Sequence, residues 1–200
     1  MVEAVDFSLA KAGYSLCIVN TGGSHANLND DYASVPAEMK VVASFFGRKV
    51  LRGISEEDIL SVASKLRKRA GDRAVLRALH FVRENERVEG ARDALKRGDL
   101  DAFYDIILES GRSSFQYLQN VYTTQQVSQQ GISLALCVTD GALSGKGGAF
   151  RVHGGGFAGT IQAFVKNEYL DEYVRVMNSV FGEGAAMPLN IRPMGAVKLF

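Results

Sequence analysis

The residue types best suited to chemistry gather in residues 151–160, where three consecutive glycines, a phenylalanine and a fourth glycine separate two strand-like runs. Glycine has no Cβ and accepts positive φ angles, so the backbone N–H groups of such a loop can approach a ligand closely. Successive N–H groups in turns of this kind form a concave surface that attracts phosphate and other anions. The pattern is typical of two structures, a phosphate-binding loop and a tight connection between strands.

Two nucleotide-binding motifs do not fit the glycine-rich residues. Gly154, Gly156 and Gly159 have the spacing of the dinucleotide-binding fingerprint, which needs a strand before the loop and a helix after it. Residues 160–165 are rich in β-branched and aromatic types, which favours a strand in place of that helix. The run over 141–148 lacks both the spacing of a P-loop and the Ser or Thr that would hold magnesium.

Two polar side chains in a second glycine-containing connection, residues 21–32, are further candidates. His25 could act as a base or a ligand, but no Cys, Asp or Glu stands at metal-ligand spacing, so a hydrogen-bonded structural role is the alternative. Tyr32 falls near the start of a predicted helix, where its hydroxyl could bind a polar ligand or its ring could pack against the helix. The sequence predicts no metal site.

Composition excludes several classes of protein. With 23 Lys and Arg against 22 Asp and Glu, the net charge of +1 favours neither nucleic acid nor an anionic membrane as a partner. Cys17 and Cys137 lie far apart in apolar runs, which predicts buried thiols in a reducing compartment. No apolar run approaches the ~18 residues of a membrane span, and residues 1–6 lack the layout of a signal peptide. We expect a soluble, cytoplasmic protein.

The order of the predicted elements indicates an α+β fold, an antiparallel sheet packed with several helices on one face. Strands are expected over 2–7 and 14–20, joined as a hairpin, and then over 160–165, 187–192 and 196–200. Helices are expected over 30–46, from a capping box at Ser55–Asp58, and over 72–96 with an end at Gly98. A further helix is expected over 99–109, with a break at 110–114 and a restart over 115–121. The last two are expected from 123 or 124 to 139 and between Asn167 and Gly182.

The centre of the helix predicted over 72–96 carries a polar block, residues 83–87. Oppositely charged side chains three positions apart stabilise a helix by about 0.2–0.5 kcal/mol for each pair. We therefore interpret the block as a solvent-exposed face with the pairs Glu84–Arg87 and Arg83–Glu86.

Four segments, taken together, resemble the C-terminal half of galactokinases, members of the GHMP superfamily of small-molecule kinases. Residues 19–32 read Val-Asn-Thr-Gly-Gly-Ser-His-Ala-Asn-Leu-Asn-Asp-Asp-Tyr, similar to that family's strand, turn, His and acidic-Tyr. Residues 77–88 are similar to its Arg-Ala-x-His-x-x-x-Glu-x-x-Arg-Val helix, and residues 109–114 to its Glu-Ser-His-x-Ser-Leu segment. Residues 148–159 resemble its third motif. The matches follow the family order across almost all 200 residues, so their combination is specific.

The resemblance implies transfer of phosphate from ATP, with Mg²⁺, to the anomeric hydroxyl of galactose. It implies that Tyr32 binds the sugar. The active-site loop beside the phosphates then consists of Gly154, Gly155, Gly156, Phe157 and Gly159. Such N–H donors suit phosphoryl transfer, which depends mostly on positioning and charge stabilisation. Residues 1–200 are then a C-terminal kinase domain, and the strands within 1–21 belong to its junction with an N-terminal kinase domain.

The sequence also departs from the family. Galactokinases carry a sugar signature, a Ser-rich phosphate loop, a magnesium-binding Glu and an Asp general base in their N-terminal half, and none of these occurs in this sequence. We therefore expect no catalytic or metal-binding residue in this chain, and no activity from it alone. Gly111 stands where the family has His, His153 where it has Thr and Ala158 where it has Gly, and residues 35–37 replace an Arg pair. These changes leave the identity of the sugar open.

Other interpretations remain open from the sequence. The chain could be a non-catalytic module for sugar sensing or protein binding, derived from a kinase, or it could belong to a kinase for a related sugar. The exposed edge of the predicted N-terminal hairpin could also pair two copies of the chain into a homodimer.

Overall fold

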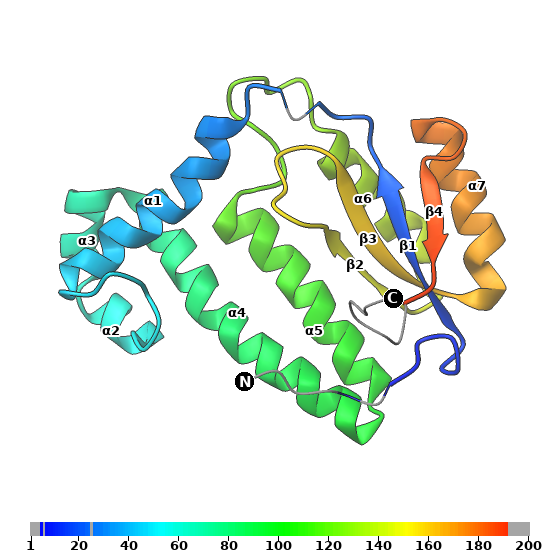
Figure 1. Ribbon diagram of the computed structural model, residues 1–200, viewed down its shortest axis with the longest axis horizontal. Coiled ribbons are helices and arrows are strands. Elements are labelled where there is room, and N and C mark those ends of the chain that lie inside the picture. The colour runs from blue at the N-terminus through cyan, green and yellow to red at the C-terminus, as the bar shows by residue number, and fades with distance from the viewer. Residues whose placement is uncertain (1–4, 6, 25, 192–200) are drawn as a thin grey trace, which may run out of the picture.

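The computed structural model describes residue 5, residues 7–24 and residues 26–191. Its centre is a four-stranded sheet with the strand order β2-β3-β1-β4 (Figure 1). Every neighbouring pair of strands is antiparallel. The strands are β1 (Tyr14–Asn20), β2 (Ala149–Val152), β3 (Thr160–Lys166) and β4 (Ala186–Leu189). The predicted α+β class is confirmed.

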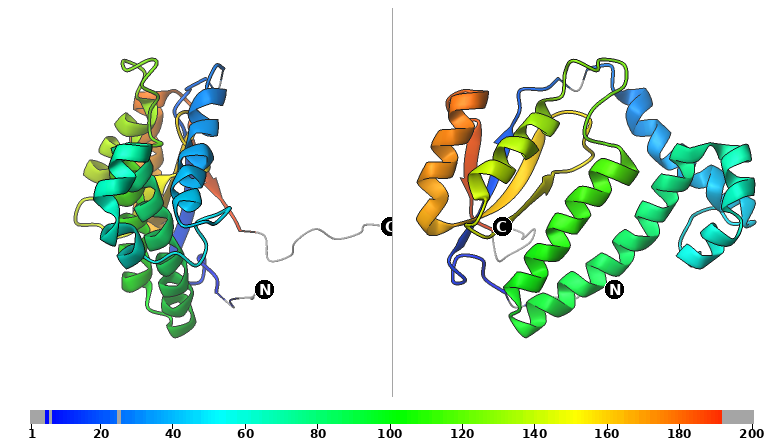
Figure 2. Two further views of the ribbon diagram at one scale, coloured as in Figure 1. Left: turned by 90° about the vertical axis from the view of Figure 1, so that its left-hand side faces the viewer. Right: turned by 180° about the vertical axis from the view of Figure 1, so that it is seen from behind.

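Helices account for most of the remaining described chain. Seen from behind in Figure 2, α6 (Gly131–Leu143) and α7 (Leu170–Phe181) lie across one face of the sheet. The long helix α4 (Asp72–Arg97) runs beside α5 (Leu100–Ser113), and α5 packs along β2. The other helical elements are α1 (Asn29–Phe45), α2 (Glu56–Ser61), α3 (Ala63–Ala70), the π-helix η1 (Ser114–Leu118) and the 3-10 helix η2 (Asn167–Tyr169).

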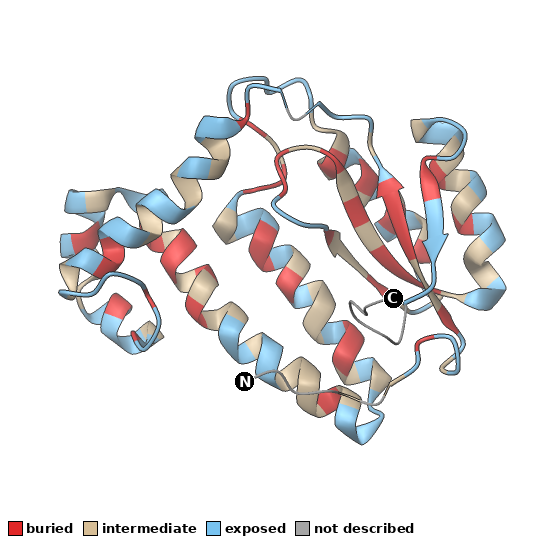
Figure 3. Cartoon of the chain, in the orientation of Figure 1, coloured by how far each residue is buried: buried red, intermediate tan, exposed pale blue. Residues whose placement is uncertain are grey.

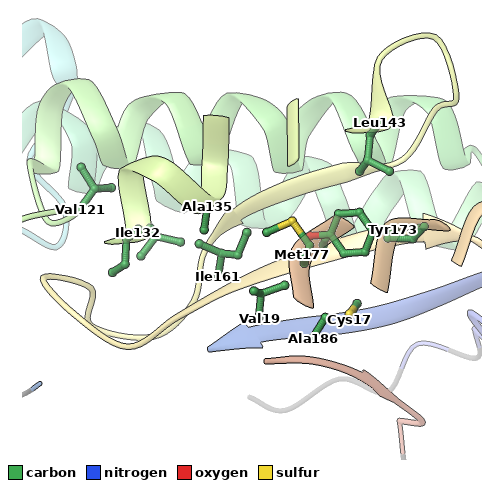
Figure 4. Packing of buried hydrophobic residues seen from close by; sticks show 13 residues of the cluster. Cys17, Val19, Val121, Ile132, Ala135, Leu143, Ile161, Tyr173, Met177 and Ala186 are labelled. Carbon is green, nitrogen blue, oxygen red and sulfur yellow. The ribbon is translucent and has the colours of Figure 1, made fainter. Parts of the chain in front are cut away.

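The main core fills the space between the sheet and the pair α6 and α7 (Figure 4). Alternate residues of a strand point to the same face, so Cys17 and Val19 of β1 both point toward these helices. Met177 of α7 is fully buried among them. The hydroxyl of Tyr173 lies 2.9 Å from the hydroxyl of Thr139, so the polar end of this buried ring is paired.

The second face of the sheet is covered in part by α5, where the sequence predicted helices on one face alone. Phe164 of β3 and Tyr14 of β1 belong to an apolar cluster with Phe103 and Tyr104 of α5. The ring centroids of Phe103 and Phe164 lie 5.7 Å apart, and those of Tyr14 and Tyr104 lie 4.7 Å apart. Large aromatic side chains on both faces of the strands need cover on both faces, because each gains stability only when its apolar area leaves water.

A separate apolar cluster holds α1, α2, α3 and α4 together away from the sheet. Figure 3 shows buried residues on the facing sides of these helices and exposed residues on their outer sides. The capping box at Ser55 and Asp58 is present at the start of α2, as predicted. The predicted end of α4 is also confirmed, since Gly98 follows it in the left-handed conformation.

The predicted pairing of β1 with residues 2–7 is wrong, because β1 has a neighbour on each side. It pairs with β3 along its whole length and with β4 over Leu16–Val19. Residues 9–13 form turns before it, while residues 1–4 and 6 lie outside the described residues. Over Leu16–Val19, β1 therefore leaves no edge open to a second copy of the chain. The strand predicted over 196–200 also lies outside the described residues.

Two predicted helix boundaries differ from the structure. Helix α6 begins at Gly131, and residues 123–130 form turns instead, because that polar run offers no apolar face to bury. Helix α5 continues through the break predicted at 110–114. Gly111 allows close packing there, since a Cβ on it would lie 3.0 Å from the carbonyl oxygen of Phe150 in β2. Tertiary packing thus overrides local propensity at this point.

The two cysteines have different environments. Cys17 is buried, as predicted, and burial raises the pKa of its thiol to about 11. Cys137 was predicted to be buried as well, but it is exposed, because only one side of α6 packs against the sheet. Within the described part of the chain, no helix is long and apolar enough to cross a membrane.

Met177→Ala should destabilise the fold by about 2–5 kcal/mol, because it removes a side chain with no exposed surface and leaves a cavity. Urea unfolding followed by circular dichroism would measure the change. Val180→Ala on the same helix is the matched control, because Val180 is 44% exposed and its truncation should cost about 0.5 kcal/mol or less. Equal losses from the two variants would contradict the assignment of α7 to the main core.

Candidate functional site

Residues 153–159 form the turn of a hairpin between β2 and β3. The amide of His153 donates a hydrogen bond to the carbonyl oxygen of Thr160 at 3.0 Å, which closes the hairpin at its base. Within the turn, φ is +82° at Gly156 and +59° at Phe157. A phenylalanine at positive φ is uncommon and costs conformational energy, so the surrounding contacts must hold it there.

Tyr32 reaches this turn from the first part of α1. Its hydroxyl donates to the carbonyl oxygen of Gly156 at 2.8 Å, and its ring meets that of Phe157 edge to face with centroids 5.4 Å apart. Burial, reinforced by the negative charge of Asp31, raises the pKa of the Tyr32 hydroxyl, so the group remains a protonated donor. The structure thus brings together Tyr32 and the glycine turn, which the sequence singled out separately.

Asn120 holds the same turn and was missed by sequence reasoning. Its side chain is 3% exposed, and it follows η1 in a segment that is well separated from the turn along the chain. Its carbonyl oxygen accepts from the amide of Phe157 at 2.5 Å, and its side-chain amide donates to the carbonyl oxygen of Gly155 at 3.1 Å. A Cβ on Gly156 would lie 1.9 Å from the carbonyl oxygen of Asn120, so only glycine fits at that position.

The N–H groups of Gly154, Gly155 and Gly156 make no hydrogen bond to the rest of the described chain. Gly154 and Gly155 are exposed. The carbonyl oxygens of Gly155 and Gly156 are, by contrast, both engaged by side chains. Gly156 itself is buried. Two acceptors of the turn are therefore paired and the exposed N–H groups of Gly154 and Gly155 are available, an arrangement that suits an anion.

Arg77 of α4 fixes the segment that leads to Asn120. Its side chain is 1% exposed, and its Nε donates to the carbonyl oxygen of Leu118 at 3.0 Å, at the end of η1. Its Nη1 donates to the hydroxyl of Ser34 at 2.9 Å and to the carboxylate of Glu38 at 3.0 Å. Burial lowers the pKa of the Arg77 guanidinium, and the charge of Glu38 opposes that effect. Arg77 therefore ties α1, α4 and η1 together behind the turn.

The polar block of α4 is exposed only in part: Asn85 and Glu86 are exposed as predicted, whereas Glu84 belongs to a partly buried network. Glu84 pairs with Arg87 at 2.8 Å, as predicted, and also with Arg151 of β2 at 3.2 Å. It accepts a further hydrogen bond from the hydroxyl of Ser110 in α5. Burial pushes the pKa of the Glu84 carboxyl upward, but the hydrogen bonds from Ser110 and Arg87 and the charge of Arg151 outweigh it, so the pKa lies below its ordinary value. These contacts join β2 to α4 and α5 just before the glycine turn.

The predicted partner of Arg83 is wrong. Arg83 forms its ion pair with Glu56 of α2 and not with Glu86. Its guanidinium also lies 5.6 Å from the ring centroid of Tyr117 in η1. A contact across elements has replaced the contact within the helix, because α4 packs against α2 and η1 along this part of its length.

His80, one turn before Glu84 on α4, is a buried imidazole beside this network. It is 5% exposed, and its Nδ1 lies 2.8 Å from the hydroxyl of Ser113. Burial lowers the pKa of His80 to about 4, with the charges of Arg87 and Arg151 reinforcing the shift and that of Glu84 opposing it. The ring is therefore neutral at physiological pH, and it forms a hydrogen bond between α4 and α5.

A cavity of about 580 Å³ lies beside the turn, with Phe157 and Ala158 in its wall. The rest of its lining comes from residues 21–24 and 26–28, from the segment 123–131 and from Leu134 of α6. The hydroxyl of Thr123 donates to the carboxylate of Asp31 in α1 at 2.7 Å, so the second segment is held to the helix that follows the first. The cavity has the size of a small-molecule site and a polar wall. His25, a sequence candidate, lies outside the described residues.

The fold is shared with a sugar kinase of known structure. The crystal structure of Lactococcus lactis galactokinase complexed with galactose superimposes with a TM-score of 0.71 at 21% identity, over 90% of this chain and 45% of that one. No protein-family model matches the chain.

Curated relatives agree with the fold. The galactokinase of Actinobacillus pleuropneumoniae is 30% identical over 169 residues, which are 82% of this chain and 41% of the relative. That of Glaesserella parasuis is 31% identical over 163 residues, which are 80% of this chain and 39% of the relative. The resemblance to galactokinases predicted from the motifs is confirmed, and the chain spans about two fifths of the length of these relatives.

His80 should make stability depend on pH. A group whose pKa is about 4 when folded and about 6.5 when unfolded binds fewer protons in the folded state. Stability from this residue is therefore complete above pH ~6.5 and is lost as the pH falls toward ~4, by at most about 3 kcal/mol. His80→Asn should flatten that part of the curve of unfolding free energy against pH, measured by urea unfolding. An unchanged slope would assign the whole pH dependence to the carboxylates.

Proposed function

We propose that the chain is the C-terminal part of an ATP-dependent kinase that phosphorylates the anomeric hydroxyl of galactose. One observation carries the proposal: Tyr32 and the glycine turn meet through a 2.8 Å hydrogen bond, in a chain similar to galactokinases over 82% of its length. A group suited to a sugar and a group of N–H donors suited to phosphate then share one site. Residues 1–200 form the C-terminal domain, and an N-terminal kinase domain supplies the general base and the main nucleotide loop.

Each part of the site has a separate task. A phenolic oxygen can accept hydrogen bonds while it donates one, so Tyr32 can receive a sugar hydroxyl while it holds the carbonyl oxygen of Gly156. The exposed N–H groups of Gly154 and Gly155 stabilise negative charge on a phosphate next to it. Fixed donors of this kind act without reorganisation during the reaction, which is how much of phosphoryl transfer is accelerated.

The turn fits a phosphate group better than a metal ion. Its donors are available and two of its carbonyl oxygens are engaged, whereas a cation requires oxygen ligands. Among the described residues, no group of three or more His, Cys, Asp or Glu side chains could hold a metal ion. In this proposal Mg²⁺ is held by the N-terminal kinase domain. ATP, when bound, supplies the phosphoryl group, and this chain binds and orients the sugar and one side of the phosphates.

A chimera tests the proposed function. The 200 residues would be joined to the N-terminal half of the Actinobacillus galactokinase in place of its own C-terminal half. With ATP, Mg²⁺ and galactose, the chimera should form galactose 1-phosphate, detected by coupled release of ADP, while the 200 residues alone should form none. The natural galactokinase is the control for assay conditions. Turnover at about 1–100 per second by the chain alone would contradict the division of labour proposed.

Tyr32→Phe in the active chimera should raise the Michaelis constant for galactose by roughly 2- to 12-fold, with little change for ATP. The factor corresponds to one lost hydrogen bond to a neutral group, about 0.5–1.5 kcal/mol. Steady-state kinetics with each substrate varied in turn would measure it. Tyr169→Phe, which removes a hydroxyl from η2, is the matched control. If the galactose constant stays at the parental value, Tyr32 supports the turn by packing and by its bond to Gly156 alone.

A further inference from the structure

We infer that Asn120 is a positioning residue for the glycine turn, and that it sets which backbone groups of the turn can reach a phosphate. The part of the inference that concerns phosphate rests on the proposed function. The inference concerns a residue that belongs to none of the four motifs shared with galactokinases.

Asn120 makes two contacts that fix the turn on both sides of Gly156. Its main-chain carbonyl oxygen accepts from the amide of Phe157 at 2.5 Å, and its Nδ2 donates to the carbonyl oxygen of Gly155 at 3.1 Å. The first contact holds Phe157 at its uncommon positive φ of +59°. The second fixes the orientation of the peptide group between Gly155 and Gly156, because a peptide unit is planar and its carbonyl and N–H point in opposite directions. The N–H of Gly156 is therefore set by the donor of Asn120.

The remaining polar atom of Asn120 shows that the residue is not an ordinary core amide. Its Oδ1 is buried and has no hydrogen-bond partner in the described chain. An unpaired buried acceptor is destabilising, and an apolar side chain of the same shape would avoid that cost. Stability alone would thus favour leucine at this position, whereas control of the turn requires the Nδ2 donor.

The segment that carries Asn120 is itself held rigidly. Gln119 turns the chain at the end of η1 with φ +56°, and its amide donates to the carbonyl oxygen of Ser114 at 2.8 Å. Arg77 of α4 donates a hydrogen bond to the carbonyl oxygen of Leu118, the residue before Gln119. Asn120 therefore reaches the turn from a fixed base, as a positioning residue must.

Asn120→Leu separates positioning from packing, because it removes the donor and the unpaired acceptor together and keeps the shape. We expect the urea midpoint to be unchanged or higher. The variant loses one hydrogen bond, from Nδ2 to the carbonyl oxygen of Gly155, so the turn should open more readily. Hydrogen exchange at the amides of Phe157 and Ala158, followed by mass spectrometry or NMR on the 200-residue chain, should therefore accelerate by roughly 2- to 12-fold. Gln116→Leu, the same chemical change at an exposed amide of η1, should leave that exchange at the parental rate.

The exchange result decides the inference whether or not the chain belongs to a kinase. Unchanged exchange in the turn, or an acceleration equal to that of core amides, would overturn it. If Asn120→Leu does not fold, Asn120→Ala is measured in the same way, with the same expected difference between the turn and the core.

In the full-length kinase, Asn120→Leu should lower kcat by about 10- to 100-fold, because a displacement of about 1 Å at a reacting group can cost that much. The galactose constant should change by less than about twofold, since Tyr32 keeps its bond to Gly156. A parental kcat would overturn the positioning role. Absence of activity from the parental protein would count against the proposed function, and the exchange experiment would still give the result for Asn120.

Discussion

The arrangement around the glycine turn depends on the burial of one charge, the guanidinium of Arg77. Removing a guanidinium from water is costly unless its donors are paired and its charge is balanced. Its partners are Glu38 and Ser34 from α1 and the carbonyl oxygen of Leu118 from η1. The cost is therefore offset only when α1 and η1 are both in place, which makes the position of η1 a condition of stability and not a local preference.

Two side chains then hold the glycine turn. Both come from segments that Arg77 fixes in place. Tyr32 comes from α1 and Asn120 follows η1, and each donates to a carbonyl oxygen of the turn. A backbone whose acceptors are paired and whose donors are available favours negatively charged ligands over positively charged ones. In the proposed site, the preference for an anion thus depends on residues outside the loop that are far away in the sequence.

Sequence reasoning succeeded where the determinants are local. The capping box at Ser55, the end of α4 at Gly98 and the strand of β1 all follow from neighbouring residue types, and all are present. It failed where a partner comes from a distant segment. The pairing of Glu84 with Arg151 spans 67 residues and that of Asn120 with Gly155 spans 35, and no periodicity records such contacts. Tyr32 and the turn were identified as candidates, but their direct contact required the structure.

The place of β1 in the middle of the sheet has a consequence for how the molecule assembles. This strand leaves the ribosome well before its two neighbours, which are β3 at Thr160–Lys166 and β4 at Ala186–Leu189. Pairings so distant along the chain are slow to form, because the entropy of closing the intervening loop is lost before the contacts are gained. Until synthesis passes β4, β1 exposes an apolar strand with at least one open edge, a state prone to association with other chains. The nascent protein therefore needs its last described strand before its first is safe from aggregation.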